Sequence, residues 1–172
     1  MVNIVLPIDF TETADVLIAG AVKFAKENRG KIFLIHVAPS DIGFAIGDMG
    51  FQYFPEVEQN EINEELKQLD RMQQQITSQG VECEHLLRQG IARDIILEYA
   101  AEKNASYIVM GSHGRSGIYD VFVGSLTKDL TKSSPVPVLV IPCHKQGKQI
   151  NSTKNKNPLF LEKRVFIYNQ FI

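Results

Sequence analysis

The sequence predicts a doubly wound α/β protein with a parallel five-stranded sheet and helices on both faces. The first observation is that apolar, strand-like runs alternate along the chain with helix-like segments, which implies right-handed crossovers. The second is that the first, second and fourth runs are continuously apolar, as in strands covered on both faces. The 172 residues, 44% hydrophobic and 22% charged, suit one globular domain with a sizeable core.

The N-terminal part predicts a strand, a helix and a second strand. Residues 2–8 form an apolar run, and the Thr-Glu-Thr sequence at 11–13 offers helix-capping chemistry. Residues 14–26 place their apolar side chains at helical spacing until Gly30 ends the helix. Residues 31–37 are rich in Ile, Phe and Val, which predicts the second buried strand.

The segment 39–55 alternates glycines with aromatic residues and predicts a loop with an apolar surface. Such a loop should pack on something. Three interpretations remain open: it folds over the sheet edge, covers a ligand as a lid, or contacts a partner.

The rest of the chain continues the alternation. An amphipathic helix, with apolar residues at steps of three and four, ends at Gly80. The expected elements are a helix at 56–79, a strand at 81–87, a helix at 91–103, a strand at 106–110, a helix from about Leu126 and a strand at 136–141.

A glycine-rich loop between the fourth strand and the following helix predicts a phosphate site. It contains Gly111, Gly114, Gly124 and Ser125. Glycine lets backbone N–H groups approach an anion, and a helix N-terminus adds unpaired donors and a favourable dipole. The alternative is a tight turn without a ligand. The loop is neither a Walker A sequence nor a dinucleotide fingerprint, since the glycine spacing differs from both.

These residues match, without a gap, the Gly-x2-Gly-x9-Gly-Ser motif of ATP-binding universal stress proteins, which the chain resembles. Residues 4–9 resemble that family's first strand and its aspartate, 35–37 the end of its second strand, and 136–142 its last strand. The resemblance covers about residues 1–143. It implies the strand order 3-2-1-4-5 of the adenine nucleotide alpha-hydrolase-like fold, with ligands bound between the first and fourth strands.

The phosphate end of the expected site lies in the loop and the helix after it. Backbone N–H groups of Gly114, Gly124 and Ser125 are expected to bind phosphates, and the hydroxyls of Ser125 and Thr127 to add donors. Arg115 supplies a fixed positive charge, unless it is a solvated surface residue.

The other end of the site lies at the first two strands. Asp9 is expected to accept from ribose hydroxyls or to help hold Mg²⁺, or alternatively to cap the first helix. The resemblance implies an adenine contact from the main chain at Val37 and an apolar loop position at Met110. His113 is a weaker candidate, because a loop histidine more often bonds backbone or water. The predicted set is completed by Pro7, Gly111 and Leu126.

Charge and cysteine content narrow the class of partner. The net charge of −2 does not favour nucleic acid or an acidic membrane. Cys83 and Cys143 are expected to be reduced, no His/Cys pair has metal-ligand spacing, and no run is long enough to span a membrane. We therefore expect a cytoplasmic protein with no catalytic or metal-ligating residues assigned.

The sequence divides into a nucleotide-binding domain at 1–144 and an extension at 145–172. The extension carries six basic residues and one acidic one, and regains strand-like residues near its end. The apolar strand at Val136–Pro142 reads as a sheet edge, and the resemblance implies a homodimer through it. The extension is the alternative cover for this edge.

The resulting hypothesis is an ATP-binding universal stress protein that acts as a nucleotide-dependent regulatory module in a stress response. A slow ATPase or nucleotide-processing enzyme is the first alternative. A nucleotide-independent dimeric adaptor is the second.

Overall fold

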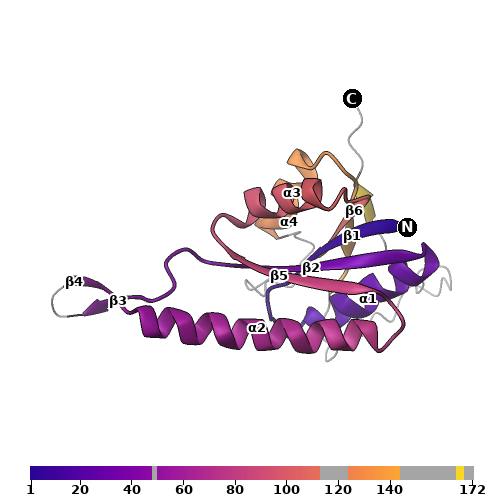
Figure 1. Ribbon diagram of the computed structural model, residues 1–172. Helices are drawn as coiled ribbons and strands as arrows, with labels where there is room; N and C mark the ends of the chain where they lie inside the picture. Colours follow the sequence, from indigo (N-terminus) through magenta and orange to yellow (C-terminus); the bar gives the residue numbers. More distant parts are fainter. Residues whose placement is uncertain (48–49, 113–123, 144–165, 169–172) are drawn as a thin grey trace, which may run out of the picture.

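The computed structural model describes residues 1–47, 50–112, 124–143 and 166–168, and these form the doubly wound fold that the sequence predicts. The main sheet has the order β5-β2-β1-β6-β7-β8 (Figure 1). Its first five members are parallel, in the predicted order, and the fold prediction is confirmed. The strands are β1 (Val2–Pro7), β2 (Gly30–Ala38), β5 (Cys83–Gln89), β6 (Tyr107–Gly111), β7 (Val138–Ile141) and β8 (Phe166–Tyr168).

Four helices cover the two faces of this sheet within the described residues. They are α1 (Ala14–Glu27), α2 (Pro55–Thr77), α3 (Ala92–Glu102) and α4 (Ser125–Ser133). Figure 1 shows α1 and α2 on one face and α3 and α4 on the other. Successive residues of β1 serve opposite faces: Ile4 and Leu6 join the core under α1 and α2, and Val5 joins the core under α3 and α4. This two-sided burial explains the continuously apolar strands.

The unequal lengths of β1 and β2 create space at one end of the sheet. Their parallel pairing ends at Pro7 opposite Ile35, and the Ile8 N–H then donates to the Ile35 carbonyl at 2.9 Å. Beyond this point β2 continues to Ala38 and remains paired with β5 on its other side. The side of β2 that faced β1 is therefore no longer covered by a strand.

The segment predicted to be a loop at 39–55 contains a β-hairpin instead. Strands β3 (Phe44–Gly47) and β4 (Gly50–Tyr53) pair antiparallel, and the rings of Phe44 and Tyr53 lie 4.9 Å apart. Gly43, at φ +86°, accepts from the Phe54 N–H at 2.7 Å and closes the base of the hairpin. Phe44, Tyr53 and Phe54 are exposed, so the interpretation that this segment folds its aromatic residues over the sheet edge is not supported at these three residues. In Figure 1 the hairpin lies beyond the N-terminus of α2, away from the sheet.

Strand β8, in the C-terminal extension, pairs antiparallel with the outer edge of β7.

Cys83 and Cys143 are both buried and free. No helix in the described part of the chain is long and apolar enough to cross a membrane.

Candidate functional site

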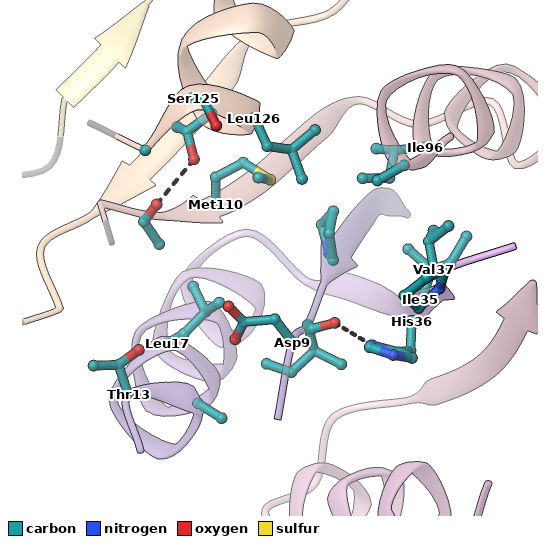
Figure 2. A pocket seen from close by; sticks show the side chains of 18 residues that line it. Asp9, Thr13, Leu17, Ile35, His36, Val37, Ile96, Met110, Ser125 and Leu126 are labelled. Atoms are coloured by element: carbon teal, nitrogen blue, oxygen red, sulfur yellow. Dashed lines mark hydrogen bonds between the residues drawn. The ribbon is translucent and has the colours of Figure 1, made fainter. Parts of the chain in front are cut away.

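A pocket of about 380 Å³ lies at the carboxyl ends of β1 and β6, where strand order reverses (Figure 2). This is the place where open parallel sheets bind their ligands, and the volume falls within the range of small-molecule sites. The pocket is lined by residues from the ends of β1, β2 and β6 and from the starts of α1, α3 and α4. They are Pro7, Ile8, Asp9, Thr13, Ala14, Leu17, Ile35, His36, Val37, Pro39, Ala92, Ile96, Met110, Gly111, Gly124, Ser125, Leu126 and Thr127.

Asp9 is the one carboxylate among the described lining residues. Its Oδ1 accepts from the Thr11 hydroxyl at 2.8 Å and from the Thr11 N–H at 3.4 Å. Asp9 does not cap α1, because the residue at the N-cap position is Thr13 and no side chain there bonds the first turn. The hydrogen bonds to Thr11 hold the Asp9 carboxylate in place, and Figure 2 shows this carboxylate among the side chains that line the pocket.

The first turn of α4 lines the pocket with backbone donors that have no partner among the described residues. Gly124 occupies the N-cap position and has no side chain to cap the helix. The first helical hydrogen bond runs from the Lys128 N–H to the Gly124 carbonyl at 2.9 Å. The N–H groups of Ser125, Leu126 and Thr127 precede this bond, so the helix supplies no acceptor for them. All three residues line the pocket.

Two predicted phosphate donors are used inside the protein instead. The Gly124 N–H donates to the Ser112 carbonyl at 3.1 Å. The hydroxyl of Thr127, which is 4% exposed, donates to the Gly111 carbonyl at 3.1 Å. These bonds fix the start of α4 against the end of β6. Their role is to hold the helix N-terminus in place, which corrects the prediction that both groups donate to a ligand.

The opposite wall is apolar and includes a free stretch of backbone. Ile35, Val37 and Ile96 face Met110 and Leu126 across the pocket (Figure 2). In a parallel ladder, alternate residues direct their N–H and C=O groups to the same neighbour. Since the Ile35 carbonyl bonds β1, the backbone groups of Val37 point to the same side, beyond the last pairing of β1 and β2.

His36 is buried beneath the pocket and connects β1 with α2. Its Nδ1 lies 2.7 Å from the Ile8 carbonyl, to which it donates, and its ring lies 4.2 Å from that of Phe10. Its Nε2 lies 3.5 Å from Oε1 of Glu65 on α2. These contacts hold the chain on both sides of Asp9, including Phe10 in its left-handed conformation at φ +54°.

Few charged or titratable side chains lie in or near the pocket among the described residues. Burial, and to a smaller extent the negative charge of Asp9, raises the pKa of the Cys143 thiol behind the site. No lysine or arginine stands among the lining residues that the structure describes. Among the described parts of the lining, the N-terminus of α4 supplies a favourable dipole for a negative charge. No group of three or more His, Cys, Asp or Glu residues able to hold a metal is found within the described ranges.

The structure brings nine of the twelve predicted site residues to this pocket: Pro7, Asp9, Val37, Met110, Gly111, Gly124, Ser125, Leu126 and Thr127. The other three, His113, Gly114 and Arg115, lie outside the described residues. Sequence reasoning missed the apolar contribution of α3, from Ala92 and Ile96. It also missed Thr13 at the N-cap of α1, Leu17 on α1 and His36 on β2. The periodicity of the helices marked Leu17 and Ile96 as core positions, and the three-dimensional arrangement of the elements shows that both border the pocket.

The fold and site define a doubly wound α/β protein with a polar-ended pocket at the switch point of its sheet. The universal stress protein family model matches residues 1–142, and the chain belongs to this family. It is 29% identical over 144 residues to universal stress protein YxiE of Bacillus subtilis, covering 81% of this chain and 97% of that protein. It is 25% identical over 151 residues to universal stress protein MJ0577 of Methanocaldococcus jannaschii, covering 81% and 93%.

Solved structures give the same result for the fold. The structure of MJ0577 superposes with a TM-score of 0.68 at 26% identity, covering 84% of this chain and 97% of that one. A universal stress protein from Archaeoglobus fulgidus, solved in complex with dAMP, superposes with a TM-score of 0.59 at 21% identity, covering 82% and 98%. The matched region ends before β8.

Proposed function

We propose that this chain binds ATP, together with Mg²⁺, and acts as a nucleotide-dependent regulatory module in a cytoplasmic stress response. The observation that carries the proposal is the pocket at the ends of β1 and β6. Its lining combines the N–H groups at the start of α4, which have no partner among the described residues, with the Asp9 carboxylate and an apolar wall. A helix N-terminus suits phosphates and an apolar slot suits a base. Two universal stress proteins of the same fold were solved with dAMP and cAMP, which supports an adenine nucleotide.

The phosphates would bind at the start of α4. The N–H groups of Ser125, Leu126 and Thr127 are the described donors, and the exposed Ser125 hydroxyl adds one more. Gly114 and Arg115, outside the described residues, are proposed to complete this end of the site with backbone N–H groups and a positive charge.

Asp9 would act between the phosphates and the ribose. Mg²⁺ prefers oxygen ligands and keeps several waters, so one protein carboxylate together with phosphate oxygens is sufficient to bind it. No three-residue metal cluster is present in the described part, so the ion would arrive with the nucleotide.

The adenine would lie between Ile96, Leu126 and the end of β2. The outward-facing N–H and C=O groups of Val37 are suited to hydrogen bond the edge of a base, while the apolar side chains contact its faces. This arrangement supports a purine and assigns the recognition of its edge to backbone atoms.

We propose binding as the primary function rather than rapid turnover. Phosphoryl transfer needs an oriented nucleophile and charge stabilisation in the transition state. Among the described lining residues the titratable groups are Asp9, bonded to Thr11, and His36, whose ring is held between Ile8 and Glu65. The described lining adds no third titratable side chain to these two. We also propose a homodimer through Val136–Pro142, which requires the edge of β7 to be released from β8.

Calorimetric titration of the full chain with ATP, with and without Mg²⁺, tests the proposal. Asp9→Asn keeps an Oδ1 acceptor for Thr11 and removes the charge, so the variant should fold normally. We expect the wild type to bind ATP more tightly with Mg²⁺ than without it, and the variant to lose this difference. If Mg²⁺ strengthens ATP binding equally in both proteins, Asp9 is not a ligand of the metal. Absence of ATP binding by folded wild type would overturn the proposed function.

A further inference from the structure

The outer edge of β7 is occupied by a strand from the C-terminal end of the same chain. β8 pairs antiparallel with it, with Val138 opposite Tyr168, Leu139 opposite Ile167 and Val140 opposite Phe166. β8 lies 25 residues beyond the end of β7, and it is the one antiparallel member of the main sheet as described. Its addition leaves the five-stranded parallel arrangement intact and covers the last parallel strand.

The edge of β7 is well suited to pairing with another strand. All four of its residues are apolar, and their exposed fractions lie between 1% and 9%. Leu139 and Ile141 enter the core on the α1 and α2 face, while Val138 and Val140 enter the other. Such an uncharged edge strand, whose side chains pack in two cores, is a template for another strand unless it is covered. Pro137 and Pro142 limit the pairing to a short stretch.

We propose that β8 is an intramolecular cap that competes with a second copy of this chain for the edge of β7. This inference rests on the proposed homodimer and adds its regulation. Two identical edge strands related by a two-fold axis pair antiparallel. β8 also pairs antiparallel, so it uses the same outward N–H and C=O groups of β7 that a second β7 would use. One edge cannot hold both strands.

The competition has a calculable effect on dimerisation. β8 pairs through three residues, and because it belongs to the same chain it meets the edge of β7 at an effective concentration on the order of millimolar. If the capped form is favoured ~10:1, only about one protomer in 11 has a free edge. Both protomers must be open to pair, so the dimer dissociation constant rises by about 100-fold.

The first experiment removes β8 pairing while keeping the full chain. Consecutive strand residues direct their N–H groups to opposite sides, so one of Phe166 and Ile167 must donate towards β7. Phe166→Pro/Ile167→Pro removes that donor in either case. Phe166→Tyr/Ile167→Val keeps both N–H groups and strand-forming residues, and is the matched control.

Sedimentation velocity over a concentration series gives the dimer dissociation constant of each protein. The cap predicts that the proline variant dimerises more tightly than wild type, by about 100-fold if the capped form is favoured ~10:1, and that the control follows wild type. Equal constants for all three proteins would overturn the cap. A proline variant that stays folded and monomeric at concentrations where the cap predicts dimer would overturn the second copy as competitor.

A cross-link then tests whether the covering strand belongs to the same chain. Val138 and Tyr168 face each other directly, so their Cα separation falls in the range that a disulfide can bridge. Oxidised Val138→Cys/Tyr168→Cys should run as a monomer on a non-reducing gel and fail to dimerise, while either single variant stays uncross-linked. A disulfide between chains would overturn the intramolecular cap in favour of strand exchange. ATP titration of the same variants is independent of this edge, so failure of nucleotide binding is distinguishable from failure of the cap.

Discussion

The N-terminus of α4 can be tested by placing a negative charge where the phosphates are expected. Ser125 is exposed and is the first residue of α4, next to an N-cap glycine that provides no side-chain cap. An acidic residue there interacts favourably with the helix dipole, so Ser125→Asp should stabilise the free protein by ~0.3–1 kcal/mol. The same charge should repel a bound phosphate. The substitution therefore predicts opposite effects on stability and on ATP affinity.

The magnitude follows from the short distances at a helix N-terminus. Two unit charges 4 Å apart interact by about 1 kcal/mol in bulk water and about 4 kcal/mol at the dielectric typical of a protein surface. Ser125 borders the pocket and faces solvent, so its environment lies between these limits. A loss of ~1.4 kcal/mol corresponds to tenfold weaker binding, and we expect at least this loss for ATP.

Titrations with ATP and adenosine, together with urea denaturation, measure both effects. Ser125→Asn is the control that resembles aspartate in shape but carries no charge. Ser133→Asp is the second control, which adds the same negative charge at the other end of α4. Ser125→Asp should weaken the binding of ATP and leave the binding of adenosine unchanged. Both controls should bind ATP with the affinity of wild type. Equal losses for ATP and adenosine would point to distortion of the pocket. Unchanged ATP affinity would refute phosphate binding at this helix.

Three further predictions concern the pocket wall and the core. Thr127→Val keeps the shape of the side chain but leaves the partly buried Gly111 carbonyl without this donor, so urea denaturation should show a loss of stability of about 1–3 kcal/mol that Thr127→Ser avoids. Ala92→Phe fills the apolar end of the pocket and should weaken ATP and adenosine alike by about 10-fold (~1.4 kcal/mol), whereas a selective loss of ATP would contradict the adenine assignment. Burial raises the pKa of Cys83 from 9.0 to about 12, so its neutral thiol stabilises the fold fully below pH 9 and progressively less as the pH rises towards 12. The stability of wild type relative to Cys83→Ala should therefore fall over this range, and a constant difference would contradict the assigned shift.

The hydrophobic pattern was sufficient to predict the parallel sheet because each central strand is buried on both faces. Ile4, Val5 and Leu6 serve two different cores, which requires an uninterrupted apolar run that is visible in the sequence. The hairpin β3–β4 could not be recognised in the same way. Its strands pair with each other, and Phe44 and Tyr53 remain exposed, so burial in the main core does not mark these two residues.

The site residues, too, could be predicted from the sequence only in part. Strand ends and glycines marked Asp9, Gly111 and the start of α4, because chain direction and backbone freedom are readable from residue types. Hydrogen bonds that use up a donor inside the protein, such as that from the Gly124 N–H to the Ser112 carbonyl, depend on coordinates. The contribution of Ile96 likewise depends on where α3 crosses the sheet.

The most direct test of the account is a nucleotide assay on freshly purified full-length protein. The protein is denatured, the released small molecules are separated by chromatography, and stripped protein is then titrated with ATP and Mg²⁺. We expect ATP to be released or bound at a ratio close to one per chain, with little ADP accumulating over hours. Neither release nor binding by folded protein would contradict the nucleotide-binding account and favour a nucleotide-independent adaptor.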